Sequence, residues 1–144
     1  MTEIVWSDFD GLANRDLYDI LALRSEVFVV EQACVFQDVD GRDVLPGSSH
    51  ALIRDSERIV AYLRVFPSAD GELKISRVVT ASSHRGRGLA ARLMVSAIER
   101  FADSQLVLDA QSQLEGWYQQ FGFVVDGDRF LEDEILHTPM RLPQ

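Results

Sequence analysis

Residues 85–90 read Arg-Gly-Arg-Gly-Leu-Ala, and they stand between a strand-like run that ends at Thr80 and the clearest helical pattern in the chain. Glycines let backbone N–H groups approach a ligand closely, and a helix N-terminus carries about half a positive charge. Arg85 and Arg87 add formal charge. The stretch therefore predicts an anion-binding turn that leads from a strand into a helix. An ordinary glycine-rich turn with two solvated arginines remains the alternative.

Two nucleotide-binding motifs do not fit this turn. A P-loop requires Gly-Lys-Ser/Thr, which is not present here, and a dinucleotide fingerprint requires strands that a crossover helix joins. The three strand-like runs before the turn are instead joined by short polar turns at 55–57 and 68–71, which is typical of an antiparallel meander. The predicted anion-binding turn therefore belongs to neither a P-loop fold nor a dinucleotide-binding fold.

The apolar pattern predicts the remaining elements. After the turn, one apolar stripe predicts a helix; its members are Leu89, Ala90, Leu93, Met94, Ala97, Ile98 and Phe101. Asn14 is expected to cap a first helix that runs through Phe28, and a long loop should follow. The expected strands are Ile4 with Trp6, 50–54, 58–66, 72–80, 106–108, 123–125 and 135–142. Pro139 places the last of them near a sheet edge. A short helix is expected over 114–121, and the long loop covers 33–49. The order predicts a single α/β domain over residues 1–144, with a central mixed, mostly antiparallel sheet flanked by helices.

Charge and cysteine content limit the partners and the compartment. The formal charge is −9, from 14 basic and 23 acidic side chains, which disfavours nucleic acid and anionic membranes as partners. Cys34 is the only cysteine, so no intrachain disulfide can form and a reducing compartment is expected. No apolar run approaches the roughly 20 residues of a membrane helix, and residues 1–8 lack the features of a signal peptide. We therefore expect a cytoplasmic protein, either a monomer or a homodimer.

The stretch 80–90, T-A-S-S-H-R-G-R-G-L-A, resembles the signature of the GNAT superfamily of N-acyltransferases, Arg/Gln-x-x-Gly-x-Gly/Ala. Arg85, Gly88 and Ala90 meet this pattern, and the order of elements matches over nearly the whole chain. A second superfamily feature, a tyrosine shortly before a Gly-Phe pair, is met by Tyr118 and the pair at 122–123. The resemblance implies the GNAT fold, with acetyl-CoA as cosubstrate and no metal.

The resemblance also implies a set of cofactor-binding residues. Backbone amides of the turn would bind the pyrophosphate, and the strand before it would pair with the pantetheine arm. Gln111 stands where many superfamily members carry asparagine. The implied residues are Val78, Val79, Thr80, Arg85, Gly86, Arg87, Gly88, Leu89, Ala90 and Gln111.

A narrower resemblance concerns both ends of the chain. Residues 23–32, Asp40-Gly41, His50, 75–79 and 132–140 are similar to the ElaA family within that superfamily. Two positions depart from the family pattern, because Glu134 replaces a glycine and Leu136 a proline. Both lie in the tail, where they bear on the acceptor rather than on coenzyme A.

Acyl transfer from a thioester to an amine needs a neutral amine, a stabilised oxyanion and, usually, a proton for the departing thiolate. A tyrosine hydroxyl has an ordinary pKa of about 10 and can donate that proton. We expect Tyr118 to be this general acid, with a packing role in an aromatic cluster as the alternative. By analogy with the superfamily, a backbone N–H at a bulged strand end near Val78 and Val79 would stabilise the oxyanion.

The acceptor side offers five candidates: Arg24, Phe28, Glu31, His50 and His137. Of these, Glu31, His50 and His137 are alternatives for the general base. Arg24 interrupts the apolar stripe of the first helix and should pair with an acid such as Asp40 or Asp43, unless it orients the acceptor or cofactor.

The residues around Gly41 suggest neither a metal site nor thiol catalysis. Asp38, Asp40 and Asp43 lack the terminal Glu and the helix pair of a calcium loop, and Cys34 lacks an activating signature.

The motifs and the resemblance together predict an acyl-CoA-dependent N-acyltransferase that acetylates a primary amine in a ternary complex. The alternatives are a non-catalytic acyl-CoA sensor and, from fold similarity alone, an enzyme that makes a small signalling molecule.

Overall fold

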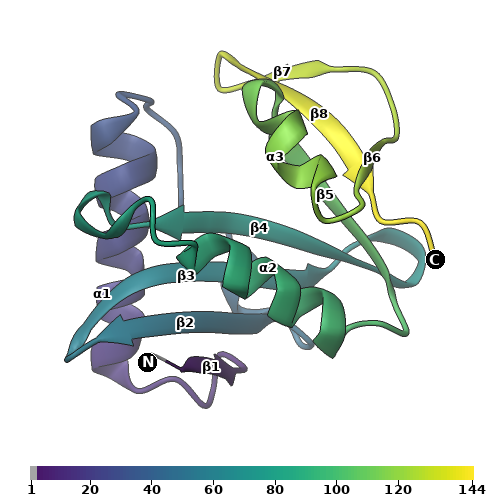
Figure 1. The fold of residues 1–144 in the computed structure, drawn as a ribbon. Coiled ribbons are helices and arrows are strands. Elements are labelled where there is room, and N and C mark those ends of the chain that lie inside the picture. The colour runs from purple at the N-terminus through teal and green to yellow at the C-terminus, as the bar shows by residue number, and fades with distance from the viewer. Residues whose placement is uncertain (1–2) are drawn as a thin grey trace.

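The computed structural model describes residues 3–144, and within them eight strands form one sheet (Figure 1). The strand order is β1-β2-β3-β4-β5-β8-β6, and β7 also pairs with β8. Only β4 and β5 pair in parallel, so the predicted mixed, mostly antiparallel sheet is confirmed. The strands are β1 (Ile4–Ser7), β2 (Ser49–Asp55), β3 (Arg58–Pro67), β4 (Glu72–Thr80), β5 (Gln105–Gln111), β6 (Val124–Val125), β7 (Phe130–Glu132) and β8 (Ile135–Arg141).

The first helix begins at its predicted cap residue, one position earlier than predicted. Asn14 is the first helical residue of α1 (Asn14–Arg24), Ala13 occupies the N-cap position, and no side chain caps this end. The predicted extension through Phe28 is present, but it winds as a π-helix, η1 (Ser25–Glu31). The other helices are α2 (Leu89–Arg100), α3 (Glu115–Gln119) and the short 3₁₀ turns η2 (Arg42–Val44), η3 (Ala69–Gly71), η4 (Ser82–His84) and η5 (Ser112–Leu114).

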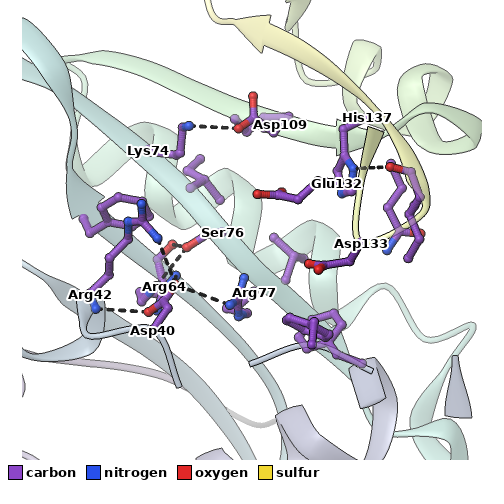
Figure 2. Close-up of a pocket in the computed structure, with 18 of the residues that line it drawn as sticks. Asp40, Arg42, Arg64, Lys74, Ser76, Arg77, Asp109, Glu132, Asp133 and His137 are labelled. Carbon is purple, nitrogen blue, oxygen red and sulfur yellow. Dashed lines mark hydrogen bonds and ion pairs between the residues drawn. The ribbon is translucent and has the colours of Figure 1, made fainter. Parts of the chain in front are cut away.

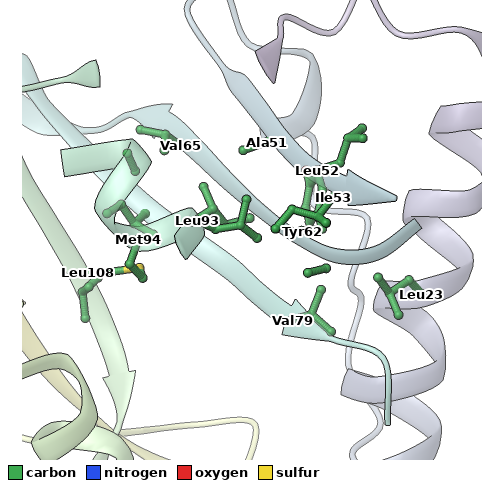
Figure 3. Close-up of a cluster of buried hydrophobic side chains, with 14 of the residues drawn as sticks. Leu23, Ala51, Leu52, Ile53, Tyr62, Val65, Val79, Leu93, Met94 and Leu108 are labelled. Carbon is green, nitrogen blue, oxygen red and sulfur yellow. The ribbon is translucent and has the colours of Figure 1, made fainter. Parts of the chain in front are cut away.

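The helices α1 and α2 cover opposite faces of the sheet (Figure 1). The apolar stripe of α2 explains its place, because Leu93, Met94 and Ala97 are fully buried against the strands (Figure 3). Residues 59–66 of β3 are all buried, since both faces of this strand are covered. Among residues 3–144 we found no helix with the length and apolarity needed to cross a bilayer.

The pairing of strand β4 with each of its neighbours is irregular, and both irregularities lie near the candidate site. Its pairing with β5 ends at Ile75 and Leu108, while β4 itself continues to Thr80. Its pairing with β3 shifts register, so that Leu63 faces two residues, Arg77 and Val78. This is a β-bulge, and the φ of +55° at Arg77 lies in the left-handed region that non-glycine residues rarely adopt.

The C-terminal strands close the sheet beyond β5. Strand β8 lies one strand in from the edge, as Pro139 suggested, with β5 on one side and the short β6 and β7 on the other. The carbonyl of Pro139 accepts a hydrogen bond from the N–H of Asp126 (2.8 Å) between these two short pairings. Strand β7 was not predicted; it forms a hairpin with β8 through a tight turn in which Asp133 and Glu134 both have positive φ.

Candidate active site

The turn before α2 has the backbone that an anion site requires. Gly86 and Gly88 have φ of +78° and +72°, and a Cβ built at either one would meet no protein atom within 4 Å. The backbone angle, rather than crowding, therefore explains the glycines, and the space outside the turn is open. The first bond inside α2 runs from the N–H of Arg92 to the carbonyl of Gly88, so the N–H groups of the preceding turn have no helical partner. These groups fit a pyrophosphate.

Arg85 connects this turn to the end of the first helix. Its guanidinium donates two hydrogen bonds to the carboxylate of Glu31, at 2.6 and 2.9 Å, and one to the carbonyl of Thr80. The pair raises the pKa of Arg85 and lowers that of Glu31. Arg87 donates a long hydrogen bond to the carbonyl of Ser83 (3.5 Å) and interacts electrostatically with the carboxylate of Asp55. Glu31, a candidate base in the sequence, thus lies at the glycine turn rather than among the cavity residues.

A cavity of about 620 Å³ is lined by the diverging parts of β4 and β5. Figure 2 shows its β4 wall, with Lys74, Ser76 and Arg77, opposite residues of β8 and the β7–β8 hairpin. The cavity brings together five of the predicted site residues from five elements: Phe28 of η1, Val78 of β4, Gln111 of β5, Tyr118 of α3 and His137 of β8. Residues more than 100 positions apart in the chain therefore share one wall.

Tyr118 lies in the wall of this cavity with only 8% of its surface exposed. Its ring packs edge-on against Trp117, with ring centres 4.9 Å apart, and against Phe123. Its hydroxyl has no hydrogen-bond partner within residues 3–144, and burial raises the pKa of Tyr118 to about 12. The group is therefore a protonated hydroxyl whose donor is free.

Gln111 and His137 are direct cross-strand partners on β5 and β8. The Nδ1 atom of His137 lies 2.8 Å from the carbonyl of Ile135, and because a carbonyl only accepts, Nδ1 must donate. The ring stacks on Phe130 with centres 5.7 Å apart. In the tautomer with the proton on Nδ1, Nε2 is the ring nitrogen that can accept a hydrogen bond.

Arg24 and His50 do not line the cavity, and their contacts indicate structural roles. Arg24 is buried and pairs with Asp43 at 2.6 Å, one of the two acids expected, and with Asp38 at 2.9 Å instead of Asp40. His50 is buried too, and its two ring nitrogens contact the Tyr62 hydroxyl (2.5 Å) and the Asp43 carbonyl (3.0 Å). Burial lowers the pKa of His50, so the ring is neutral and fully bonded.

The sequence reasoning missed two arginines beside the cavity. Arg64 of β3 pairs with Asp40 (2.9 Å) and Asp43 (3.0 Å), and Arg77 of β4 pairs with Asp38 (2.7 Å) and Asp40 (3.3 Å). With Arg24 these residues form one arginine–aspartate cluster, which comprises Arg24, Arg64, Arg77, Asp38, Asp40 and Asp43. The signal was available for Arg64, because it interrupts an apolar strand just as Arg24 interrupts an apolar helix.

The three aspartates are thus held by arginines. Among the residues that the structure describes, no group of three or more His, Cys, Asp or Glu side chains is arranged to hold a metal ion.

The site combines a glycine turn at a helix N-terminus with a bulged strand that separates from its parallel neighbour, and a cavity lies where the two strands separate. Together with the matches described next, these features define an acyltransferase that uses acyl-CoA. Residues 24–143 match the acetyltransferase (GNAT) domain family. With the relatives described next, this match shows that the chain belongs to the GNAT acetyltransferases and, among them, to the ElaA-like proteins.

The relatives match over nearly their full length. A UPF0039 protein of Mycobacterium tuberculosis is 42% identical over 144 residues, which cover 96% of this chain and 90% of that protein. Protein ElaA of Escherichia coli is 36% identical over 145 residues, covering 95% of each chain.

Two solved structures are similar along the whole chain. The crystal structure of Escherichia coli ElaA superposes with a TM-score of 0.92 at 34% identity, covering 99% of this chain and 100% of that one. The structure of an acyl-CoA N-acyltransferase from Pseudomonas aeruginosa superposes with a TM-score of 0.93 at 37% identity and the same coverage. The GNAT fold and the ElaA resemblance predicted from the sequence are confirmed.

Proposed function

We propose that this protein transfers an acetyl group from acetyl-CoA to a primary amine, by direct attack of the amine within a ternary complex. The observation that carries the proposal is the protonated and unpaired hydroxyl of Tyr118, a largely buried residue that lines the cavity where β4 and β5 diverge. No buried side-chain nitrogen or oxygen in residues 3–144 lacks a hydrogen-bond partner, so the unpaired Tyr118 hydroxyl must reach the open space of the cavity, where a bound group could accept its hydrogen bond.

The donor would lie along two elements that this chain offers. The backbone of Gly86, Gly88 and the first turn of α2 would bind the pyrophosphate. Beyond Ile75 the edge of β4 is not paired with β5, so the pantetheine arm can add there as an extended chain, with Gln111 facing it at the end of β5. The acyl group then lies near the bulge at Arg77 and Val78.

The chemistry follows from the groups around that point. The amine nitrogen forms a bond to the thioester carbon, and the C–S bond breaks as the tetrahedral species collapses. Backbone at Val78 would stabilise the oxyanion, and Tyr118 would give its proton to the departing thiolate. His137, with Nε2 free to accept, is the base that the cavity favours for the proton of the attacking amine, directly or through water.

The second candidate function is an acyl-CoA sensor without catalysis. A pure binder does not need a proton donor for a thiolate, and Tyr118 could then be replaced at no cost. The free hydroxyl of Tyr118 therefore favours the enzyme over the sensor.

One assay separates the two. The protein is incubated with acetyl-CoA and a panel of primary amines, and both free coenzyme A and the acetylated amine are measured. The proposal expects the two products in equal amounts with at least one amine. Binding of acetyl-CoA without release of coenzyme A on any amine would favour the sensor.

A further inference from the structure

Arg77 adopts an unfavourable backbone conformation at the bulge of β4. Its φ of +55° costs an L-residue steric strain, and such conformations persist only where the surroundings fix them. The residue lies next to Val78, which lines the cavity. Something other than intrinsic preference must therefore hold this part of the strand.

The guanidinium of Arg77 is fixed by three acceptors. Its Nε donates to a carboxylate oxygen of Asp38 at 2.7 Å, and its Nη2 donates to the Asp38 carbonyl at 3.0 Å and to Asp40 at 3.3 Å. The same group stacks over the ring of Phe36, 5.4 Å from its centre. A planar group with contacts on its edge and on one face has little freedom to move.

The two aspartates are themselves anchored in the buried part of the arginine–aspartate cluster. The second carboxylate oxygen of Asp38 accepts from Nε of Arg24 at 2.9 Å, and Asp40 accepts from both terminal nitrogens of Arg64, at 2.9 and 3.0 Å. Nε of Arg64 also donates to the hydroxyl of Ser76, the residue before Arg77 (2.9 Å). The contacts run without a gap from buried arginines to the bulge.

We propose that Asp38 and Asp40 are positioning residues for acyl transfer, because they hold Arg77 and thereby fix the bulge that sets Val78 against the reacting thioester. This inference rests on the proposed function, since it assigns the bulge a role in that reaction. The competing explanation is that pairing with β3 alone sets the bulge and that the ion pairs of Arg77, which is 20% exposed, are ordinary surface contacts.

Replacement of Arg77 by Gly separates the two explanations. Glycine adopts positive φ without strain, so the substitution leaves the backbone angle accessible and removes only the guanidinium. If the ion pairs fix the bulge, kcat should fall on the order of 100-fold, because small displacements of a reacting group are costly. The dissociation constant for coenzyme A should not change, since the turn at 85–90 is intact. Arg77→Lys, which keeps the charge but not the planar fork, should give an intermediate kcat.

Two matched controls test whether relief of a positive φ, or a change to any ion-paired arginine, lowers kcat by itself. Ser56→Gly relieves a similar positive φ of +57° in the β2–β3 turn. Arg54→Lys alters an arginine that pairs with Asp16 at 2.6 Å and does not line the cavity. Both should keep the wild-type kcat at a temperature where all variants are folded. A wild-type kcat in Arg77→Gly would overturn the inference.

Amide hydrogen exchange keeps the inference separate from the proposed function. Faster exchange at Val78 in Arg77→Gly than in Ser56→Gly, with other β4 amides unchanged, is expected if the guanidinium fixes the bulge. Equal exchange at Val78 would overturn the inference whatever the enzyme does. If the wild-type protein acetylates no amine, the proposed function fails, and a positioning role in that reaction fails with it, whereas the exchange result still decides what holds the bulge.

Discussion

Tyr118 and His50 are both buried side chains with polar atoms, and their partners give them different roles. His50 has a partner on each ring nitrogen, whereas the Tyr118 hydroxyl has none within residues 3–144. The sequence predicted Tyr118 as the general acid and offered His50 as one of three alternatives for the base. The pairing of β2 with β3 brings Tyr62 to His50, and such contacts are not visible in local patterns.

Replacing Tyr118 by Phe should remove the proton donor and leave the packing intact. We expect kcat to fall by at least about 100-fold, the usual contribution of a general acid, with an unchanged dissociation constant for coenzyme A. Steady-state kinetics and calorimetry measure the two quantities. Because the pKa of Tyr118 is about 12, the wild-type kcat should also show no alkaline decline through loss of this proton below about pH 11. An unchanged kcat in the variant would remove Tyr118 from the mechanism.

His50 should make the folded protein sensitive to mild acid. Burial lowers its pKa in the folded state, so the unfolded chain binds the proton first as pH falls below about 6.5. Stability is therefore complete above that pH and decreases below it, by at most about 1.4 kcal/mol per pH unit from this one group. An NMR titration of the imidazole should give an apparent pKa below the ordinary value. A value at or above about 6.5 would contradict the buried, bonded ring.

The elements follow from the sequence to different degrees. Helix α2 and the β2–β3–β4 meander could be predicted because their apolar periods are regular. The π-helical turn at Ser25–Glu31 and the bulge at Arg77 could not, because tertiary contacts hold them rather than local preference. The arginine–aspartate cluster connects α1, β3 and β4 to the loop after η1 and to η2, which carries Asp43, so it depends on where five segments meet.

Loss of Arg24 should test how strongly this cluster stabilises the fold. In Arg24→Met two buried carboxylates, Asp38 and Asp43, lose a partner, although Arg64 and Arg77 still compensate them. We expect the free energy of unfolding to fall by about 3 kcal/mol, the low end for a broken buried pair. Urea denaturation measures it, with Arg54→Met as the control. The half-exposed Arg54–Asp16 pair should contribute less than about 1 kcal/mol, and equal losses in the two variants would contradict the account.

At the scale of the whole molecule, the family resemblance predicted the fold but not which acceptor candidates lie together. The order of the longer helices and strands along the chain and the glycine turn followed from residues 80–90 and the apolar pattern. Both match the structure, except that β7 was not predicted. Only the structure separates the acceptor candidates, because Phe28 and His137 line the cavity whereas Glu31 bonds to Arg85 at the glycine turn. The hydrophobic periodicity of a sequence does not indicate which of several candidate side chains lines a cavity.

The proposed function requires the turn at 85–90 to bind the pyrophosphate of acyl-CoA. Gly88→Glu tests it, because the side chain would project into the open space of the turn with a repelling charge, at a φ of +72°. Gly71→Glu is the matched control, since Gly71 has a φ of +79°, similarly open surroundings and no place in the cavity wall.

Calorimetric titration of coenzyme A into the folded wild-type protein and the two variants decides the matter. We expect wild-type affinity in Gly71→Glu and no measurable binding in Gly88→Glu. Wild-type affinity in Gly88→Glu would contradict pyrophosphate binding at this turn.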